Sequence, residues 1–320
     1  MSRKAGSLPK SILLRILPQK YIRLIKFMLK AQWRVEQLER NVQRITTTLA
    51  YAQYGDTLLQ QRLAKSVINE HEYGVHSQNG EDGILLYIFS QVGTTNRFFV
   101  EFGIEDGREC NSANLCINFG WQGLYMELDP MYVESARNYY DMMLGDRRED
   151  VKILQTLITP ENINTLLTQN QTPTEPDLFS IDIDSFDYWV WEALDVVKPR
   201  VMSVEYNAVY GPTRSLTIPR KQGMFDRHSY HYSGFYFGAS LTALTRLANK
   251  KGYELVGCDS SGTNAFFVRK DVLKGDLKPV TPEQAYYPSM AYNSDVRQDG
   301  RVDIPEQFPY IEHLEFVNIE

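Results

Sequence analysis

The sequence predicts an α/β fold in which seven strands, mainly parallel, form a sheet covered by helices on both faces. Short apolar runs alternate with helix-type segments from about residue 80 to about residue 270, and this alternation is typical of a parallel sheet. Several of these runs end in acidic residues, as strands do at the ligand-binding edge of such a sheet. A short connection joins the last two runs, 253–258 and 265–269, and indicates an antiparallel pair at one edge.

The expected elements alternate along this part of the chain. Strands are expected at 98–102, 123–129, 151–157, 178–182, 201–205, 253–258 and 265–269. Helices are expected at 80–91, 110–119, 133–140, 186–197 and 238–251. One more helix begins at Thr159, whose hydroxyl can cap it, and Pro160, which suits a first turn. The stretch 206–235 and the tail after Asp271 have no such pattern, so we expect loops there.

The composition is that of a globular protein with a large core. The chain has 320 residues, of which 43% are hydrophobic, so global disorder is not expected. The three cysteines, Cys110, Cys116 and Cys258, lack metal-type spacing, and their small, odd number argues against a disulfide framework. This usage fits a reducing compartment, so the sequence predicts a cytoplasmic location.

The N-terminal residues differ in charge from the rest of the chain. Residues 1–44 contain eleven Lys or Arg and two Glu, a net +9, which leaves −15 for the remainder of a chain whose total is −6. Basic residues at positions 20, 23, 26, 30 and 34 recur at helical spacing beside an apolar face. We therefore expect a basic helical arm at 1–70 and one large domain at 71–320 that ends in a loop-rich tail.

Two roles for this arm are compatible with its pattern. A basic amphipathic helix is typical of proteins held on an anionic membrane surface, which predicts peripheral contact at the inner membrane. A helix of this kind also packs on a sister subunit, which predicts a homo-oligomer. No apolar stretch approaches the ~20 residues that a transmembrane helix needs. The acidic body would be repelled by phosphates, so nucleic acid is not an expected partner.

A glycine-containing loop follows the first expected strand. The strand ends at Glu101, and Gly103 and Gly107 follow it, spaced four apart. Gly103 allows a sharp turn close to a ligand, and Gly107 allows the following helix to lie close to the strand. Glu105 stands where the dinucleotide fingerprint has its middle glycine, and an acid there repels a pyrophosphate. The loop therefore favours a cofactor without phosphate and argues against a nicotinamide cofactor.

A second acidic strand end follows about twenty residues later. The strand that starts at Gly123 leads into Glu127 and Asp129. In a doubly wound sheet this position lies beside the glycine loop, where a carboxylate can accept hydrogen bonds from both ribose hydroxyls. We expect Asp129 in this role, with Glu127 nearby, so the cofactor is expected to contain adenosine.

Taken together, the motifs resemble the class I S-adenosylmethionine-dependent methyltransferases and, within them, the FkbM-type group. The resemblance covers roughly residues 70–270. It implies a Rossmann-like fold, with Glu101, Gly103 and Gly107 at the methionine end of the cofactor and Asp129 on its ribose. The motifs that carry it are Ser77–Gly83, Val100–Gly107, Asp129–Pro130, Ile181–Asp184, Val204–Asn207 and Tyr236–Leu241.

The segment before the first strand has two interpretations. The resemblance implies that Ser77, Gln78 and Glu81 cover the cofactor, with Gln78 or Glu81 reaching its amino-acid part. The same residues also suit a helix N-cap followed by acids in the first turn.

Polar side chains at two neighbouring strand ends form a candidate metal site. Asp182 ends the fourth strand and Glu205 the fifth, with Asp184 and Asn207 two residues beyond them. Such oxygen ligands suit Mg²⁺, Mn²⁺ or Ca²⁺, and an ion there could lower the pKa of an acceptor hydroxyl. The arrangement is similar to that of metal-dependent O-methyltransferases, although there the second acid and the amide are adjacent, whereas Tyr206 intervenes here. Without a metal, Asp182 or Asp184 could act as the general base.

The expected loop at 206–235 carries two further candidate bases, His228 and His231. A histidine above the carboxyl edge of the sheet could remove a proton from a hydroxyl, although each could also be an ordinary surface residue. The loop also contains aromatic and basic residues, which suit a sugar acceptor, or could pack together as a lid. Its length favours a binding loop.

The expected activity is transfer of a methyl group from S-adenosylmethionine to a sugar hydroxyl of a glycan, glycolipid or glycosylated metabolite. One alternative is a small phenolic or polyketide acceptor, which predicts a narrow apolar pocket. Another is a non-catalytic scaffold, which need not bind S-adenosylmethionine. A nicotinamide-dependent oxidoreductase is the fourth possibility, and Glu105 argues against it.

Overall fold

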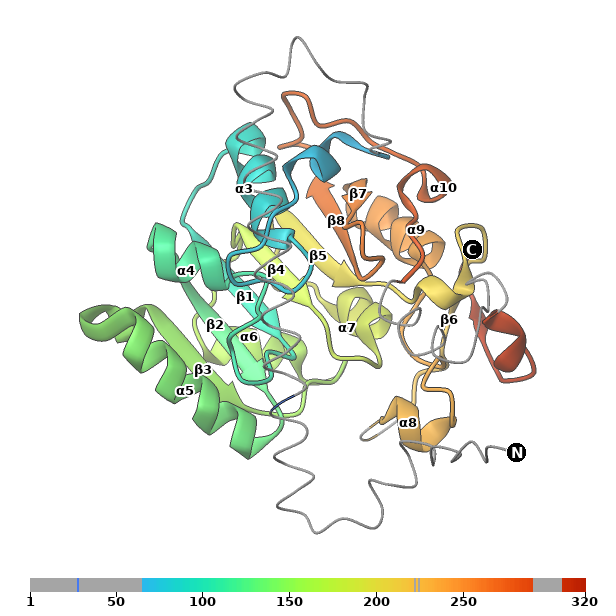
Figure 1. The fold of residues 1–320 in the computed structure, drawn as a ribbon, viewed down its shortest axis with the longest axis horizontal. Coiled ribbons are helices and arrows are strands. Elements are labelled where there is room, and N and C mark those ends of the chain that lie inside the picture. The colour runs from blue at the N-terminus through green and yellow to red at the C-terminus, as the bar shows by residue number, and fades with distance from the viewer. Residues whose placement is uncertain (1–27, 29–64, 222, 224, 290–306) are drawn as a thin grey trace, which may run out of the picture. The chain divides into compact units, whose positions relative to one another are not determined.

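The computed structural model describes Met28 and residues 65–221, 223, 225–289 and 307–320 (Figure 1). The chain divides into two compact units, 1–60 and 61–320. The expected basic arm at 1–70 lies outside the described residues except for Met28 and 65–70, so its role stays a prediction. In the part of the chain that the structure describes, no helix has the length and apolar character needed to cross a membrane.

The second unit is built on the seven-stranded sheet that the sequence predicts. The strand order is β3-β2-β1-β4-β5-β8-β7, in which β8 is antiparallel to both of its neighbours and the other pairs are parallel. This confirms the Rossmann-like fold class and the antiparallel edge pair. The strands are β1 Phe98–Phe102, β2 Gln122–Glu127, β3 Val151–Gln155, β4 Leu178–Ile181, β5 Val201–Glu205, β7 Tyr253–Cys258 and β8 Asn264–Arg269.

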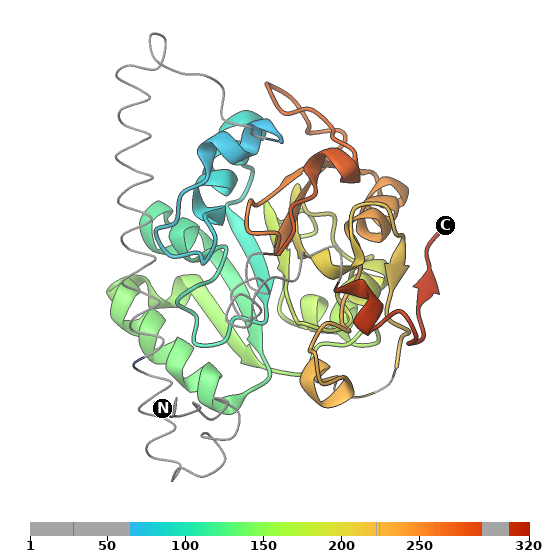
Figure 2. The same ribbon diagram turned by 45° about the vertical axis from the view of Figure 1, so that its right-hand side comes forward.

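Helices cover both faces of the sheet (Figures 1 and 2). One face packs against α3 Glu81–Val92, α4 Ala113–Phe119 and α5 Pro130–Leu144, and the other against α6 Ile163–Gln169, α7 Asp187–Ala193 and α9 Leu241–Lys251. The strands supply both cores because successive side chains point to opposite faces. Phe99 of β1 joins the first core, whereas Val100 and Phe102 join the second.

The stretch 206–235 is less irregular than predicted. It contains a 3-10 helix at Ala208–Tyr210, the two-residue strand β6 Leu216–Thr217 and the one-turn helix α8 Arg227–Tyr230. Elements this short leave no periodic signal in a sequence. The C-terminal strand β9, Val317–Asn318, pairs antiparallel with β6, so the chain's last residues lie beside this stretch (Figure 2).

A third apolar cluster joins the same stretch to the C-terminal segment. Tyr210 and Tyr236 are buried in it with Phe308 and Ile311. The tail after Asp271 therefore does more than loop over the domain, because its end completes the core under the predicted binding loop. The tail also contains α10 Pro282–Ala285 and a 3-10 helix at Phe308–Tyr310, and two further 3-10 helices lie at Val67–His71 and Gly145–Asp150.

At the amino ends of the strands, opposite the carboxyl ends, β4 is connected to β1 by Asp177. Its fully buried carboxylate accepts hydrogen bonds from the backbone N–H groups of Thr95, Asn96 and Arg97, at 2.7–2.9 Å. The Nε atom of Arg200 lies 3.0 Å from it. This carboxylate precedes β4 and fixes the start of β1, so its role is structural.

Candidate functional site

A cavity of about 540 Å³ lies at the carboxyl edge of the sheet. Residues that follow each of β1 to β5 line it, together with the start of β8 and the segment that leads into α3. Because β8 runs antiparallel to β5, its first residue lies at the edge where β5 ends. Among the predicted site residues, those that line the cavity are Gln78, Glu81, Glu101, Gly103, Glu127, Asp182, Asp184 and Glu205. Those that do not line it are Ser77, Gly107, Asp129, Asn207, His228 and His231.

Gly103 is required by the backbone of the neighbouring strand. Its φ is +65°, and a Cβ atom there would lie 1.7 Å from the carbonyl oxygen of Asp182. The predicted sharp turn is present, but the close neighbour is the end of β4. No side chain fits between the ends of β1 and β4 at this point, so the two strand ends stay in contact beside the cavity.

Gly107 packs against α5 and not, as predicted, against the following helix. Its φ is +76°, and a Cβ atom would lie 2.9 Å from Cε2 of Tyr140 and 3.0 Å from Cβ of Ala136. The hydroxyl of Tyr140 donates to the carbonyl oxygen of Gly107 at 2.9 Å. Gly107 therefore fixes the loop to α5 from outside the cavity.

Two acidic residues at the cavity have left-handed backbone conformations, which are unusual for residues with side chains. Glu105 has a φ of 46° and Asp184 a φ of 54°. Glu105 occupies the position where the dinucleotide pattern has glycine, so the chain keeps the left-handed turn while placing a carboxylate there. Strained residues of this kind cluster at functional sites, and both of these line the cavity.

Glu101 joins the end of β1 to the start of α4. Its buried carboxylate accepts hydrogen bonds from the backbone N–H groups of Asn111 at 2.7 Å and Ser112 at 2.9 Å, and from the Ser112 hydroxyl at 2.5 Å. Burial raises the pKa of Glu101 to about 7, although these hydrogen bonds oppose the shift. The Ser112 hydroxyl lies 2.9 Å from that of Tyr125, which the Tyr140 hydroxyl contacts at 2.7 Å. A continuous buried network thus connects Glu101 to Gly107.

The carboxylate that faces the cavity after β2 is Glu127. Its Oε1 atom accepts from the N–H groups of Leu128 at 2.7 Å and Asp129 at 2.9 Å, and its Oε2 atom accepts from that of Glu105 at 3.0 Å. Asp129, expected on the ribose, instead caps α5 by accepting from the Met131 N–H at 2.7 Å. Because proline follows it at the first helical position, Asp129 is committed to the helix, and Glu127 is the acid available to a ligand.

The segment before α3 contributes to the start of the helix and, with other residues, to the lining of the cavity; its predicted role as a cover for the cofactor stays a prediction. The Ser77 hydroxyl accepts from the Asp82 N–H at 2.9 Å, so Ser77 stabilises the helix start outside the cavity. Glu81 lines the cavity and is almost fully buried. Its carboxylate accepts from the Asn79 N–H at 2.7 Å and from Nδ2 of Asn264 at 2.9 Å. Glu81 therefore links this segment to the start of β8.

Asp182, Asp184 and Glu205 converge as predicted. Each offers an oxygen atom within 4.8 Å of those of the other two. Burial raises the pKa values of Asp182 and Glu205 well above their usual range, and their neighbouring acids add to this. The Oε2 atom of Glu205 is buried without a hydrogen-bond partner. The Nη1 atom of Arg227, from α8, lies 2.5 Å from Oδ1 of Asp184.

Asn207, predicted as a metal ligand, does not belong to this cluster. Its Oδ1 atom accepts from the Val209 N–H at 3.0 Å, and its Nδ2 atom donates to the carbonyl oxygens of Phe235 at 2.7 Å and Phe237 at 3.0 Å. The side chain is thus used to hold the loop. The amide that faces the cavity is Asn264, which the sequence analysis did not select, and only its position just before the last predicted strand could have indicated it.

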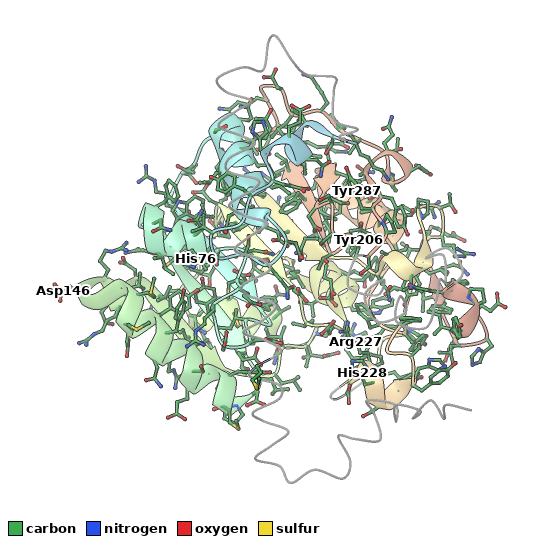
Figure 3. The ribbon with its side chains drawn as sticks, in the orientation of Figure 1. His76, Asp146, Tyr206, Arg227, His228 and Tyr287 are labelled. Carbon is green, nitrogen blue, oxygen red and sulfur yellow. The ribbon has the colours of Figure 1, made fainter. Side chains whose placement is uncertain are left out.

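Neither predicted histidine base reaches the cavity. The ring of His228 packs against Gly234, where a Cβ atom would lie 2.6 Å from its Cε1 atom. His231 contacts Ser233 through Nδ1 at 2.7 Å, and its ring centre lies 6.0 Å from that of His313. The residue of α8 that lines the cavity is Arg227, labelled beside His228 in Figure 3.

The segment that contains Tyr287 and Ser289 lies beside the cavity, next to the end of β5. The Tyr206 hydroxyl donates to the carbonyl oxygen of Tyr287 at 2.7 Å, and Figure 3 shows these two residues side by side. The Tyr287 N–H donates back to the same hydroxyl at 3.1 Å. These bonds hold the segment that carries Ser289, which lines the cavity.

The lining fits an adenosine cofactor and, at its other end, a divalent cation. The volume lies within the range of about 300–1,000 Å³ typical of small-molecule sites. Leu128, Leu157 and Ile158 provide apolar surface beside Glu127. Asp182, Asp184 and Glu205 are the hard oxygen donors that Mg²⁺ and Mn²⁺ prefer, and a cation would satisfy the unpartnered Glu205 oxygen.

Comparison with known proteins finds no family model that matches the chain and no match among curated proteins. Solved structures that the chain is similar to include the methyltransferase domain of bacterial CtHen1, with 14% sequence identity, a TM-score of 0.38, and coverage of 60% of this chain and 99% of that one. Another is the N-terminal domain of EvdMO1 with SAH bound, with 12% sequence identity, a TM-score of 0.37, and coverage of 61% of this chain and 83% of that one. A third is the glycopeptide N-methyltransferase MtfA complexed with SAM, with 9% sequence identity, a TM-score of 0.37, and coverage of 61% of this chain and 96% of that one.

Proposed function

We propose that the protein is an S-adenosylmethionine-dependent O-methyltransferase that acts on a sugar hydroxyl of a glycan, glycolipid or glycosylated metabolite. The observation that supports this most is the arrangement of the cavity along the sheet edge. Glu127 and apolar side chains lie on the β2 and β3 side of the Gly103 turn, and Asp182 and Glu205 lie on the β4 and β5 side. A methyl donor and an acceptor can thus meet above the end of β1.

The half of the cavity at β1, β2 and β3 holds the cofactor in this proposal. Glu127 keeps a lone pair on Oε2 for a ribose hydroxyl, since that atom accepts one backbone hydrogen bond. Leu128, Leu157 and Ile158 cover the adenine ring. S-adenosylmethionine supplies an electrophilic methyl group on a sulfonium ion. Its positive charge suits a cavity in which acidic side chains far outnumber the single basic one, Arg227, among the described lining residues.

The half at β4, β5 and β8 holds the acceptor. Its lining combines polar side chains with aromatic ones. The polar residues are Gln78, Asn79, Thr263, Asn264 and Ser289, and the aromatic residues are Phe186, Tyr206 and Phe225. This favours a sugar over a phenolic or polyketide acceptor, because a phenolic ring would leave the polar groups without partners.

Catalysis consists of positioning and proton removal. The transfer breaks the bond between sulfur and the methyl carbon and forms a bond between that carbon and the acceptor oxygen. The hydroxyl proton passes to the carboxyl pair of Asp182 and Glu205, whose pKa values burial raises, so that these groups hold a proton more tightly than exposed carboxylates do. With Mg²⁺ or Mn²⁺ bound, Asp182, Asp184 and Glu205 would instead hold the ion, which would lower the pKa of the acceptor hydroxyl.

Calorimetry with S-adenosylmethionine and its product S-adenosylhomocysteine tests the cofactor, and turnover with EDTA, followed by Mg²⁺ or Mn²⁺, tests the ion. We expect micromolar binding of both nucleosides and loss of turnover on chelation. Absence of binding would favour a non-catalytic scaffold. Turnover that survives EDTA would assign Asp182 and Glu205 to proton transfer alone.

We further propose that residues 1–45 attach the cytoplasmic protein to the membrane surface or join subunits, which rests on their net positive charge. Deletion of these residues should abolish co-sedimentation with anionic liposomes or reduce the oligomer measured by light scattering. The proposal is wrong if deletion changes neither.

A further inference from the structure

The acceptor half of the cavity contains two buried oxygen atoms without hydrogen-bond partners. They are Oε2 of Glu205 and Oδ1 of Asn264, and both residues line the cavity. The Asn264 side chain is 3% exposed, so bulk solvent does not satisfy its oxygen. Buried acceptors are normally paired, and two of them at one end of a ligand cavity indicate a ligand group that donates hydrogen bonds.

The two residues are direct neighbours across β5 and β8. Their Cα atoms are partners in the antiparallel register. The Tyr206 N–H donates to the Thr263 carbonyl oxygen at 2.9 Å, which makes the adjacent pair a hydrogen-bonded one. Glu205 and Asn264 therefore form a non-hydrogen-bonded pair, in which side chains share a face and approach most closely.

The orientation of the Asn264 amide is fixed by Glu81. Nδ2 of Asn264 donates to Oε1 of Glu81 at 2.9 Å, so turning the amide over would place two oxygen atoms against each other. Glu81 itself is 1% exposed and stands near other acids: burial raises the pKa values of Glu101 and Asp259, and the charge of Glu81 adds to both shifts. Asn264 thus lies between two acids, since its Nδ2 atom contacts Glu81 and its register partner is Glu205, and its oxygen stays without a partner.

Positive charge from the protein is scarce in this cavity. Arg227 is the one basic side chain among the described residues that line it, and its guanidinium contacts Asp184. Acidic side chains line both halves, including Glu81, Asp182 and Glu205 in the acceptor half. A phosphate or carboxylate on the part of the acceptor that enters would be repelled, whereas a cation would be attracted.

We propose that the acceptor carries a protonated amine, which binds between Glu205 and Asn264 beside Glu81. The acceptor is then an amino sugar, and its ammonium group sets the position of the hydroxyl that is methylated. A hydroxyl has one hydrogen and can donate to one of the two oxygen atoms, whereas an ammonium group has three and can donate to both. Glu205 can both bind the amine and share in proton removal, since its Oε2 atom is unpartnered while a side-chain hydrogen bond links the residue to Asp182. This inference rests on the proposed function.

Binding of matched sugars to the full-length protein tests it. The probes are the methyl glycosides of glucosamine, galactosamine and mannosamine and their N-acetylated forms, which have the same ring without the charge. They are titrated by calorimetry into protein saturated with S-adenosylhomocysteine, in EDTA. We expect at least one amine to bind tenfold or more tightly than its N-acetylated form. Equal or weaker binding of the amine in all three pairs would overturn the proposal.

Variants assign the preference to this pair. Glu205→Gln keeps the side-chain shape and Asn264→Ala removes the amide, and we expect either to reduce the amine preference to less than threefold with unchanged affinity for S-adenosylhomocysteine. The control variant Glu175→Gln replaces an exposed acid at the opposite edge of the sheet and should keep the amine preference. The amine preference persisting in Glu205→Gln would refute it even if Asn264→Ala fails to fold. Loss of S-adenosylhomocysteine affinity with the amine preference intact would indicate that Glu205 and Asn264 bind the cofactor and not the acceptor. Failure of the wild-type protein to bind S-adenosylhomocysteine would count against the proposed function first.

Discussion

Glu101→Gln should flatten the dependence of stability on pH. Burial raises the pKa of Glu101 from its usual 4.5 to about 7, so the folded protein holds this proton more tightly than the unfolded chain. A raised pKa contributes stability that is complete below pH 4.5 and is lost as the pH rises through 7. The full loss for a shift of about 2.5 units is roughly 3.4 kcal/mol, of which about 2.5 kcal/mol falls between pH 5 and pH 8.

Urea denaturation at pH 5 and at pH 8 measures this difference. Asp82 and Asp187, whose burial also raises their pKa values to about 6, contribute in the same direction in both proteins, so they cancel in the comparison. We expect the unfolding free energy of the wild type to fall more between the two pH values than that of the variant, by about 2.5 kcal/mol. Glu175→Gln, which removes an exposed acid, should behave as the wild type. An equal fall in Glu101→Gln and wild type would show that Glu101 is ionised in the folded protein, and the reasoning would fail.

Four further substitutions separate binding from stability. Glu127→Gln should weaken S-adenosylhomocysteine binding, measured by calorimetry, about tenfold. Asp129→Ala should leave this affinity unchanged and should cost about 1 kcal/mol of stability, because it removes a helix cap. The opposite pattern would indicate that Asp129, and not Glu127, binds the ribose. Gly103→Ala should destabilise the folded protein by about 3 kcal/mol or more in thermal melts. The new Cβ atom would lie 1.7 Å from a backbone carbonyl oxygen, and the residue would have to keep a left-handed conformation. A melting temperature equal to that of the wild type would contradict this contact. Asp177→Ala should cost about 3–5 kcal/mol, because it leaves the Arg200 guanidinium without its ion-pair partner and three backbone N–H groups without their acceptor. Cofactor affinity in the folded fraction should not change, and a loss of stability below 1 kcal/mol would be incompatible with that network.

The sheet could be predicted from the sequence because most of its strands are short apolar runs that are buried on both faces. Helix starts were harder, since tertiary contacts decide them. Residues 110–112 were expected in a helix, but Glu101 takes the N–H groups of Asn111 and Ser112, and α4 begins at Ala113. In the other direction, α5 begins at Pro130, earlier than the expected 133, because Asp129 caps it.

The site was predictable where strand ends alone decide it. Asp182 and Glu205 were expected together because adjacent parallel strands end at the same edge, and they do meet. Asn207 and Asp129 were assigned to ligands, but their side chains make local hydrogen bonds instead. Asn207 bonds to the loop at Phe235, and Asp129 caps α5 at Met131. Asn264 was missed because its place beside Glu205 depends on the register of an antiparallel strand, which no pattern in the sequence specifies.

The pairing of β9 with β6 has a practical consequence for protein production. Ile319 donates its N–H to the Ser215 carbonyl oxygen at 2.9 Å and accepts the Ser215 hydroxyl at 2.7 Å. An affinity tag fused directly after Glu320 would disturb the pairing of β9 with β6. It would thereby also disturb the aromatic cluster that supports α8. Purification handles are better attached through a flexible spacer, and activity lost on C-terminal fusion should be restored by proteolytic removal of the tag.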